Sequence, residues 1–274
     1  MIICQNHVEA IAEFEWMIQD AKFGEASRKV VVEEFLDGIE LSVFVLTDGK
    51  NYVLLPEAKD YKRIGEGDKG LNTGGMGAVS PVPFADDAFI KKTIEKIVKP
   101  TINGLQKDGL DYKGFVFIGI IKVSDEPYII EYNCRMGDPE TEVVMPRLKN
   151  DLVELFIATA KQQLDTVKIS IDERYAAATV AVSGGYPNNF EKGFEITGLN
   201  NDVDDTILFQ SGTKQEGKKT VTSGGRVLCV TALAGSLEDA VHKTQERLRQ
   251  IKYDGMYYRR DIGYEFAETY SGEE

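Results

Sequence analysis

A carboxylate and an amide lie two residues apart where an apolar run ends, as Glu131 and Asn133 within Tyr128–Arg135. Alternate side chains of a β-strand share a face, so the two would lie about 6–7 Å apart along the strand. Oxygen donors of this kind suit a hard cation such as Mg²⁺ that also binds phosphates. If the strand continues, Arg135 shares this face and adds a guanidinium for phosphate or carboxylate. An exposed polar strand end would also explain these residues.

A turn rich in carboxylates follows directly, in Met136–Glu142. It carries Asp138, Glu140 and Glu142, and it interrupts an otherwise apolar strand. This change from apolar to densely polar sequence is typical of the edge of an active site.

A glycine-rich segment holds six glycines from Gly65 to Gly77. Its first part, Gly65–Gly70, matches G-x-G-x-x-G, but a dinucleotide-binding fingerprint also needs a helix that opens inside it. The sequence continues as Leu71–Gly77, which is too rich in glycine to begin a helix. We expect a loop whose backbone approaches a ligand closely and whose N–H groups can bind an anion, with a flexible surface loop as the alternative.

Two further segments could bind parts of a nucleotide. Lys62 and Arg63 precede the glycine-rich segment and could neutralise phosphates, although solvated surface charge explains such a pair equally well. Lys29–Leu36 is rich in valine and predicts a strand, which leads into a tight turn at Asp37–Glu40. Backbone groups there could bind the edge of a base, and Glu40 could accept from sugar hydroxyls.

Composition excludes several other chemistries. The chain has 274 residues and a formal net charge of −13, which argues against a nonspecific nucleic-acid binder. No apolar run is long enough for a membrane span, and the first residues do not resemble a signal peptide, so we expect a cytoplasmic protein. Three cysteines and two histidines make a disulfide framework, a zinc site or a Ser-His-Asp triad improbable. Phosphoryl transfer fits this inventory, because it depends mostly on positioning and charge neutralisation.

Periodicity and turn signals predict the elements that position these residues. A helix should cover the first 24 residues and end at Gly24, and Pro100 should kink or split a second helix. We expect strands at 29–36, 41–46, 52–55, 114–123, 128–133, 176–182, 206–209 and 226–231, and helices at 86–105, 150–163 and 236–251. Thr47–Lys50 is a hairpin signal between the second and third of these strands, and Asp151 with Glu154 resembles a capping box at the start of the helix at 150–163. The more polar connector after residue 164 predicts two domains, 1–164 and 165–274. The class is α+β with mixed or antiparallel sheets.

Two long motifs, Gly67–Gly77 and Arg135–Glu140, strongly resemble the phosphoribosylamine–glycine ligase (glycinamide ribonucleotide synthetase) family of the ATP-grasp superfamily. Val31–Ser42 resembles the family's adenine-binding hinge, and Thr222–Leu228 and Tyr258–Gly263 resemble its carboxy-terminal domain. The similarity covers essentially the whole chain. It implies an amino-terminally truncated ATP-grasp domain followed by a small mixed α/β domain.

The resemblance implies an activity in purine biosynthesis. ATP would phosphorylate the carboxylate of glycine to a glycyl phosphate, and the amine of 5-phosphoribosylamine would attack it, giving glycinamide ribonucleotide, ADP and phosphate. Carried over by residue, the Mg²⁺ or Mn²⁺ ligands are Glu131 and Asn133. Adenine would bind at Glu33, Glu34, Phe35 and Leu36, the ribose at Glu40, and the phosphates near Lys62 and Arg63. Glycine and phosphoribosylamine would bind among Asn72, Thr73, Gly74, Gly75, Met76, Gly77, Arg135, Asp138, Pro139 and Glu140.

The resemblance also implies that an amino-terminal part is missing from the chain, with its glycine-rich phosphate loop and the lysine before it. We therefore expect the chain alone to be inactive or nearly so. Another ATP-grasp carboxylate–amine ligase is one alternative, and a silent fragment or partner-binding module is another. The sequence does not indicate an oligomeric state.

Overall fold

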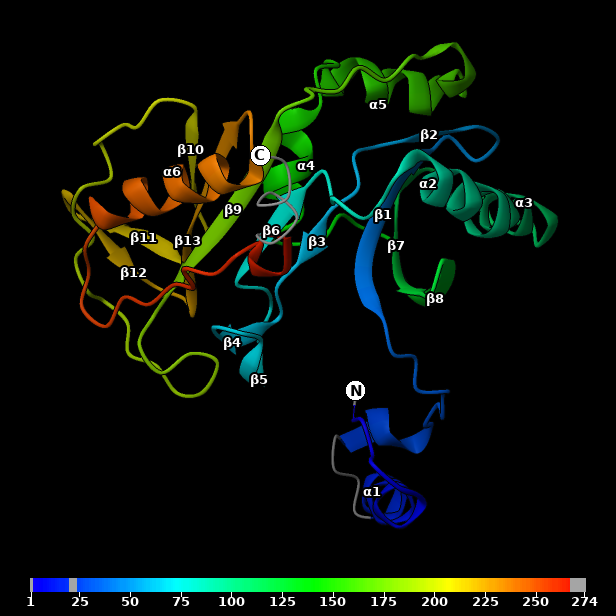
Figure 1. Cartoon of the computed structure of the whole chain (residues 1–274), viewed down its shortest axis with the longest axis horizontal. Coiled ribbons are helices and arrows are strands. Elements are labelled where there is room, and N and C mark those ends of the chain that lie inside the picture. The colour runs from blue at the N-terminus through cyan, green and yellow to red at the C-terminus, as the bar shows by residue number, and fades with distance from the viewer. Residues whose placement is uncertain (1, 20–23, 267–274) are drawn as a thin grey trace, which may run out of the picture. The chain divides into compact units, whose positions relative to one another are not determined.

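The computed structural model describes residues 2–19 and 24–266 (Figure 1). The chain divides into two compact units, and the boundary in the sequence lies between Gly38 and Ile39. The first unit holds helix α1 (His7–Gln19) and a short 3₁₀ helix, Gly24–Arg28. The amino-terminal helix is thus confirmed over His7–Gln19, while residues 20–23 before its expected end lie outside the described residues.

The strand expected at 29–36 is wrong, because this segment forms neither helix nor strand. A strand needs a partner for its backbone N–H and C=O groups. No described strand pairs with this segment, and Val31 and Val32 are 80% and 82% exposed. Its valines favour an extended chain but cannot supply the partner.

A four-stranded antiparallel sheet begins the second unit, in the order β2-β1-β7-β8. The strands are β1 (Ile39–Thr47), β2 (Tyr52–Leu54), β7 (Gly114–Val123) and β8 (Glu126–Asn133). The predicted hairpin is confirmed between β1 and β2, and β7 turns directly into β8 at Ser124, whose φ is +55°.

One face of this sheet is covered by helices α2 (Asp87–Thr93) and α3 (Lys99–Lys107), which a π-helical turn at Ile94–Val98 joins. Leu41 and Val43 of β1 pack there with Phe89 and Ile97. The expected helix is divided as one of the two predicted outcomes: the π turn lies just before Pro100, which has no N–H to continue the α-helical ladder.

A five-stranded antiparallel sheet has the order β10-β13-β9-β6-β3. The strands are β3 (Lys59–Asp60), β6 (Gly77–Ser80), β9 (Tyr175–Val182), β10 (Thr206–Gln210) and β13 (Arg226–Ala234). The α+β class with antiparallel sheets is confirmed. This sheet combines strands from both sides of residue 165, so the domain division there stays a prediction.

Helices cover both faces of the five-stranded sheet (Figure 1). Val180 and Val182 of β9 pack with Val143 and Val144 of α4 (Thr141–Arg147), whereas Ala181 packs with Leu248 of α6 (Leu237–Arg249). Because alternate residues of β9 face opposite sides, α4 and α6 must lie on opposite faces. This arrangement places α4, and the polar turn before it, beside β6.

The remaining elements are small. Helix α5 (Leu152–Lys161) is capped by Asp151, whose carboxylate accepts from the Val153 and Glu154 N–H groups as the sequence predicts. A 3₁₀ turn follows at Leu164–Thr166. Two hairpins pair β4 (Arg63–Gly65) with β5 (Lys69–Asn72) and β11 (Thr213–Glu216) with β12 (Lys219–Thr222). None of the described helices has both the length and the apolar character needed to cross a membrane.

Candidate functional site

The four-stranded sheet presents Glu131 on the face opposite to helices α2 and α3. Ala58, Ser42, Gly119 and Glu131 form one row across the strands, since each is paired with the next. A Cβ at Gly119 would lie 3.1 Å from Cγ of Glu131. Gly119 therefore leaves room for the glutamate side chain to lie across β7.

Asn133 shares the face of Glu131, as the two-residue spacing predicts. The register of β8 shifts by one residue at Ile130, yet Glu131 and Asn133 remain opposite Gly119 and Phe117. The amide nitrogen of Asn133 donates to Oε1 of Glu131 at 3.3 Å. Within the described residues no group of three or more His, Cys, Asp or Glu side chains could hold a metal ion. A carboxylate with an amide oxygen nevertheless suits a hard cation whose other ligands are phosphate oxygens and water.

A carboxylate cluster, made of Glu40, Asp60 and Glu140, surrounds Lys62. The Lys62 ammonium pairs with Glu40 and lies 4.0 Å from Oδ1 of Asp60. Burial alone would lower the pKa of Lys62, but Asp60 and Glu40 outweigh it and raise that pKa. Lys62 is therefore held as a cation on the face that carries Glu131, whose charge also raises its pKa.

Glu140 is the most buried member of the carboxylate cluster, at 4% exposure. Its carboxylate folds back over Gly137, where a Cβ would come within 2.6 Å of its oxygens, and it accepts from the Ser42 hydroxyl at 3.1 Å. Burial and the neighbouring Asp60 raise the pKa of Glu140 to about 7. Burial is also the main cause that raises the pKa of Asp60. A group with this pKa can hold or release a proton near neutral pH.

Hydrogen bonds hold the glycine-rich loop Asn72–Gly77 to Tyr61 and Lys62, the two residues that join β3 to β4. The Thr73 N–H and hydroxyl both donate to the Lys62 carbonyl, and the Met76 N–H donates to the Tyr61 carbonyl. Gly75 has a φ of +115°, and a Cβ there would lie 2.3 Å from Cδ of Pro139. Only glycine fits this close packing, which brings the loop against the Asp138–Pro139 turn.

Arg226 joins the loop to that turn from the five-stranded sheet. Its Nη1 donates to the Gly74 carbonyl at 2.7 Å and to Oδ1 of Asp138 at 2.8 Å, while Nη2 donates to Oδ2 of Asp138 at 3.0 Å. Two parallel bonds between a guanidinium and a carboxylate form a strong and directional pair.

The segment that matches G-x-G-x-x-G is the β4–β5 hairpin and opens no helix, which confirms the rejection of a dinucleotide fingerprint. Arg63 donates to the Gly70 carbonyl across this hairpin. Arg259 has no exposed side-chain surface and pairs with Asp68 and Asp261, and the Gly67 N–H donates to Asp261. The carboxy-terminal segment thus fixes the hairpin that follows Lys62.

Most of the predicted site residues lie in the second unit, and of these Met76 is buried in the hydrophobic core. These are Glu40, Lys62, Asn72, Thr73, Gly74, Gly75, Met76, Gly77, Glu131, Asn133, Asp138, Pro139 and Glu140. Arg63 lies on the neighbouring hairpin, and Arg135 is exposed with its guanidinium on the Met136 carbonyl. Glu33, Glu34 and Phe35 are exposed and Leu36 is half-buried, and all four belong to the first unit.

Sequence reasoning did not single out Ser42, Asp60, Gly119, Arg226 or Arg259. Ser42 and Gly119 are small residues inside apolar runs, which is a weak signal of a face that must leave space. Arg226 and Arg259 stand in the two carboxy-terminal motifs of the family resemblance, but nothing in their spacing indicates a partner.

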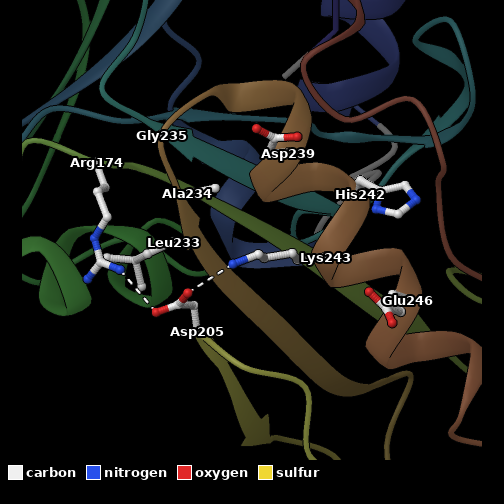
Figure 2. Close-up of a pocket in the computed structure, with 9 residues that line it drawn as sticks. All are labelled: Arg174, Asp205, Leu233, Ala234, Gly235, Asp239, His242, Lys243 and Glu246. Carbon is white, nitrogen blue, oxygen red and sulfur yellow. Dashed lines mark hydrogen bonds and ion pairs between the residues drawn. The ribbon is translucent and has the colours of Figure 1, made fainter.

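A separate hollow of about 360 Å³ lies beside α6 and the end of β13 (Figure 2). Arg174 and Lys243 both pair there with Asp205. None of the predicted site residues lines this hollow.

Models of a known protein family match two parts of this chain. Residues 1–141 match the model of the phosphoribosylglycinamide synthetase ATP-grasp (A) domain, and residues 176–265 match the C domain of the same synthetase. A phosphoribosylamine–glycine ligase of Chlorobaculum tepidum is 43% identical over 96% of this chain and 62% of its own length. A bifunctional purine biosynthetic protein of Pichia angusta is 44% identical over 96% of this chain and 34% of its length.

Two solved structures share the fold of this chain. The phosphoribosylamine–glycine ligase of Thermotoga maritima matches with a TM-score of 0.79 and 36% identity, over 95% of this chain and 64% of that one. A biotin carboxylase domain of Hydrogenobacter thermophilus matches with a TM-score of 0.68 at 16% identity, over 93% and 55%, which shows a shared fold alone. The chain spans less than two thirds of the length of these relatives.

Proposed function

Because this chain belongs to the phosphoribosylglycinamide synthetase family, we propose that it carries most of the catalytic centre of an ATP-dependent ligase. The ligase joins glycine to 5-phosphoribosylamine and forms glycinamide ribonucleotide, ADP and phosphate. The observation that carries this proposal is the meeting of Lys62, Glu131, the glycine-rich loop and the Asp138–Glu140 turn around one face.

A divalent cation, Mg²⁺ or Mn²⁺, would be held by Glu131 and Asn133, whose oxygen donors and shared face fit it. When bound, such an ion neutralises phosphate charge and aligns the phosphates for transfer. Lys62 contributes a second positive charge, because Asp60 and Glu40 raise its pKa and keep its ammonium group protonated. On this proposal Glu40 also binds the ribose of ATP, and Glu33–Leu36 binds the adenine.

The reaction has two steps. A carboxylate oxygen of glycine attacks the γ-phosphorus of ATP, and ADP leaves. The amine nitrogen of 5-phosphoribosylamine then attacks the carbonyl carbon of the glycyl phosphate, phosphate leaves, and the nitrogen loses a proton. The backbone N–H groups of the Asn72–Gly77 loop are suited to an anion, and Arg135 adds a further positive charge for one. Glu140 is suited to accept the proton of the amine, because its pKa is about 7.

The proposal also concerns the catalytic activity of the 274-residue chain by itself. Since its relatives are longer, we propose that the 274-residue chain alone turns over slowly or not at all. Small-molecule substrates are the expected partners, and the cytoplasm is the expected location.

The test assays the gene product at its full length with ATP, Mg²⁺, glycine and 5-phosphoribosylamine. We expect ADP release that requires both glycine and the amine. Release without glycine, or with another amino acid in its place, would contradict the proposed substrate. The 274-residue chain is assayed in parallel, and rapid turnover by it would contradict its proposed inactivity.

A further inference from the structure

Both backbone polar groups of Gly74 are held by residues that lie more than a hundred positions away in the sequence. Its N–H donates to the Tyr186 hydroxyl at 3.0 Å, and its carbonyl accepts from Arg226 at 2.7 Å. Both partners fall within residues 176–265, the C-domain match, whereas Gly74 falls within the ATP-grasp match.

Three glycines allow this close approach. A Cβ at Gly74 would lie 3.0 Å from Cζ of Arg226, and a Cβ at Gly225 would lie 2.3 Å from the Tyr186 ring. Gly75 packs on Pro139 in the same way. The motif Thr222–Leu228 therefore supplies two adjacent residues of this contact: Gly225, which leaves room for the Tyr186 ring, and Arg226.

The second half of the contact is the Asp138 carboxylate. Both of its oxygens accept from Arg226, and its backbone carbonyl also accepts, at 3.0 Å. The Arg226 side chain is 24% exposed, against 57% for Asp138, so the guanidinium is the sheltered partner. Both oxygens of the Asp138 carboxylate are therefore engaged by Arg226.

We propose that Arg226 is a positioning residue, which with Asp138 fixes the glycine-rich loop against the turn before α4. The proposal rests on the proposed function and refines it. The loop and the turn are then held together as one rigid surface toward glycine and 5-phosphoribosylamine. Asp138 acts through Arg226 rather than by contact with the reacting atoms. Preorganised backbone of this kind contributes to catalysis through geometry.

The first measurement needs no substrate. Hydrogen exchange is followed in peptides covering Asn72–Gly77 for the 274-residue chain and for Arg226→Met. We expect exchange there to become roughly tenfold faster or more, because charge-assisted bonds to the loop and turn are lost. Arg226→Lys, which keeps the charge, should restore part of the protection. The control is Arg174→Met, which removes the pair with Asp172 and Asp205 and should leave these peptides unchanged. Unchanged exchange in Arg226→Met would overturn the proposal.

The second measurement uses the full-length gene product. Arg226→Met and Asp138→Asn should each raise the KM for glycine or 5-phosphoribosylamine about tenfold and leave the KM for ATP within twofold. Their double variant should be no worse than either one, since both remove the same anchor. Additive losses would overturn the proposal, and so would an Asp138→Asn variant with a lower KM, because Arg226 would then bind a substrate anion itself. If the wild-type protein releases no glycine-dependent ADP, the proposed function fails while the exchange experiment still decides the role of Arg226.

Discussion

The hydroxyl of Ser42 donates to Oε1 of Glu140 at 3.1 Å inside the protein, although 98 positions separate the two residues in the sequence. This contact ties strand β1 to the turn that begins α4. It places the buried Glu140 carboxyl beside Asp60 and within the electrostatic reach of Lys62. Several properties of the site depend on this arrangement.

The titration of Glu140 makes stability fall as pH rises. The unfolded chain releases this proton near the ordinary value of 4.5, whereas the folded protein holds it up to about 7. The free energy of unfolding contributed by this group is therefore present at acidic pH and is lost between those values, by up to about 3 kcal/mol. Glu140→Gln has no proton to lose, so its stability relative to wild type should rise across this range. Urea unfolding from pH 4.5 to 8 measures the difference, with the exposed Glu246→Gln as control. Parallel curves for Glu140→Gln and wild type would contradict the prediction.

Replacing Gly75 should damage the loop far more than replacing a helical glycine. Gly75→Ala places a Cβ 2.3 Å from Pro139 at a φ of +115°, and should destabilise the chain by about 2 kcal/mol or more. Gly104 in α3 has nothing within 4 Å of its Cβ position, so Gly104→Ala should stabilise by up to about 1 kcal/mol. Thermal unfolding of both variants checks the opposite signs, and equal effects would count against the packing of Gly75 on Pro139.

Gly119→Ala should weaken metal activation without unfolding the sheet. The new methyl group would press on Glu131, which lies at an exposed strand end and can move aside. We expect the Mg²⁺ concentration for half-maximal activity of the full-length gene product to rise about tenfold. The midpoint of urea unfolding should change little. A variant with unaltered Mg²⁺ dependence would argue against Glu131 as a ligand.

Two adjacent arginines should differ sharply in their contribution to stability. Arg259 is fully buried between Asp68 and Asp261, so Arg259→Met leaves uncompensated carboxylates and should cost about 3–5 kcal/mol. Arg260 is 72% exposed and pairs with Glu66 in water, so Arg260→Met should change the free energy of unfolding very little. Chemical unfolding of the two variants tests this, and a similar loss in both would contradict the role of Arg259 in holding the hairpin.

The sequence predicted most elements whose partners are close in the chain. The β1–β2 hairpin, the break at Pro100 and the Asp151 cap follow from local turn and capping chemistry. The strand expected at 29–36 failed because strand propensity cannot supply a pairing partner. The Glu131 and Asn133 pair was predictable because two-residue spacing fixes a shared face.

The long-range part of the site was not predictable in this way. Asp60 and Ser42 belong to different strands, and only the fold brings them to Glu140. Arg226 lies 88 positions from Asp138, so no local period links the two. The family motifs marked these segments, but the contacts between the segments come from tertiary structure.

Oxygen transfer from glycine to phosphate tests the central claim most directly. The full-length gene product is incubated with ATP, Mg²⁺, 5-phosphoribosylamine and glycine whose carboxylate oxygens are ¹⁸O. If the carboxylate attacks ATP to form a glycyl phosphate, each phosphate released with glycinamide ribonucleotide carries one ¹⁸O atom, which mass spectrometry detects. Phosphate free of ¹⁸O, released in step with the product, would contradict the proposed reaction.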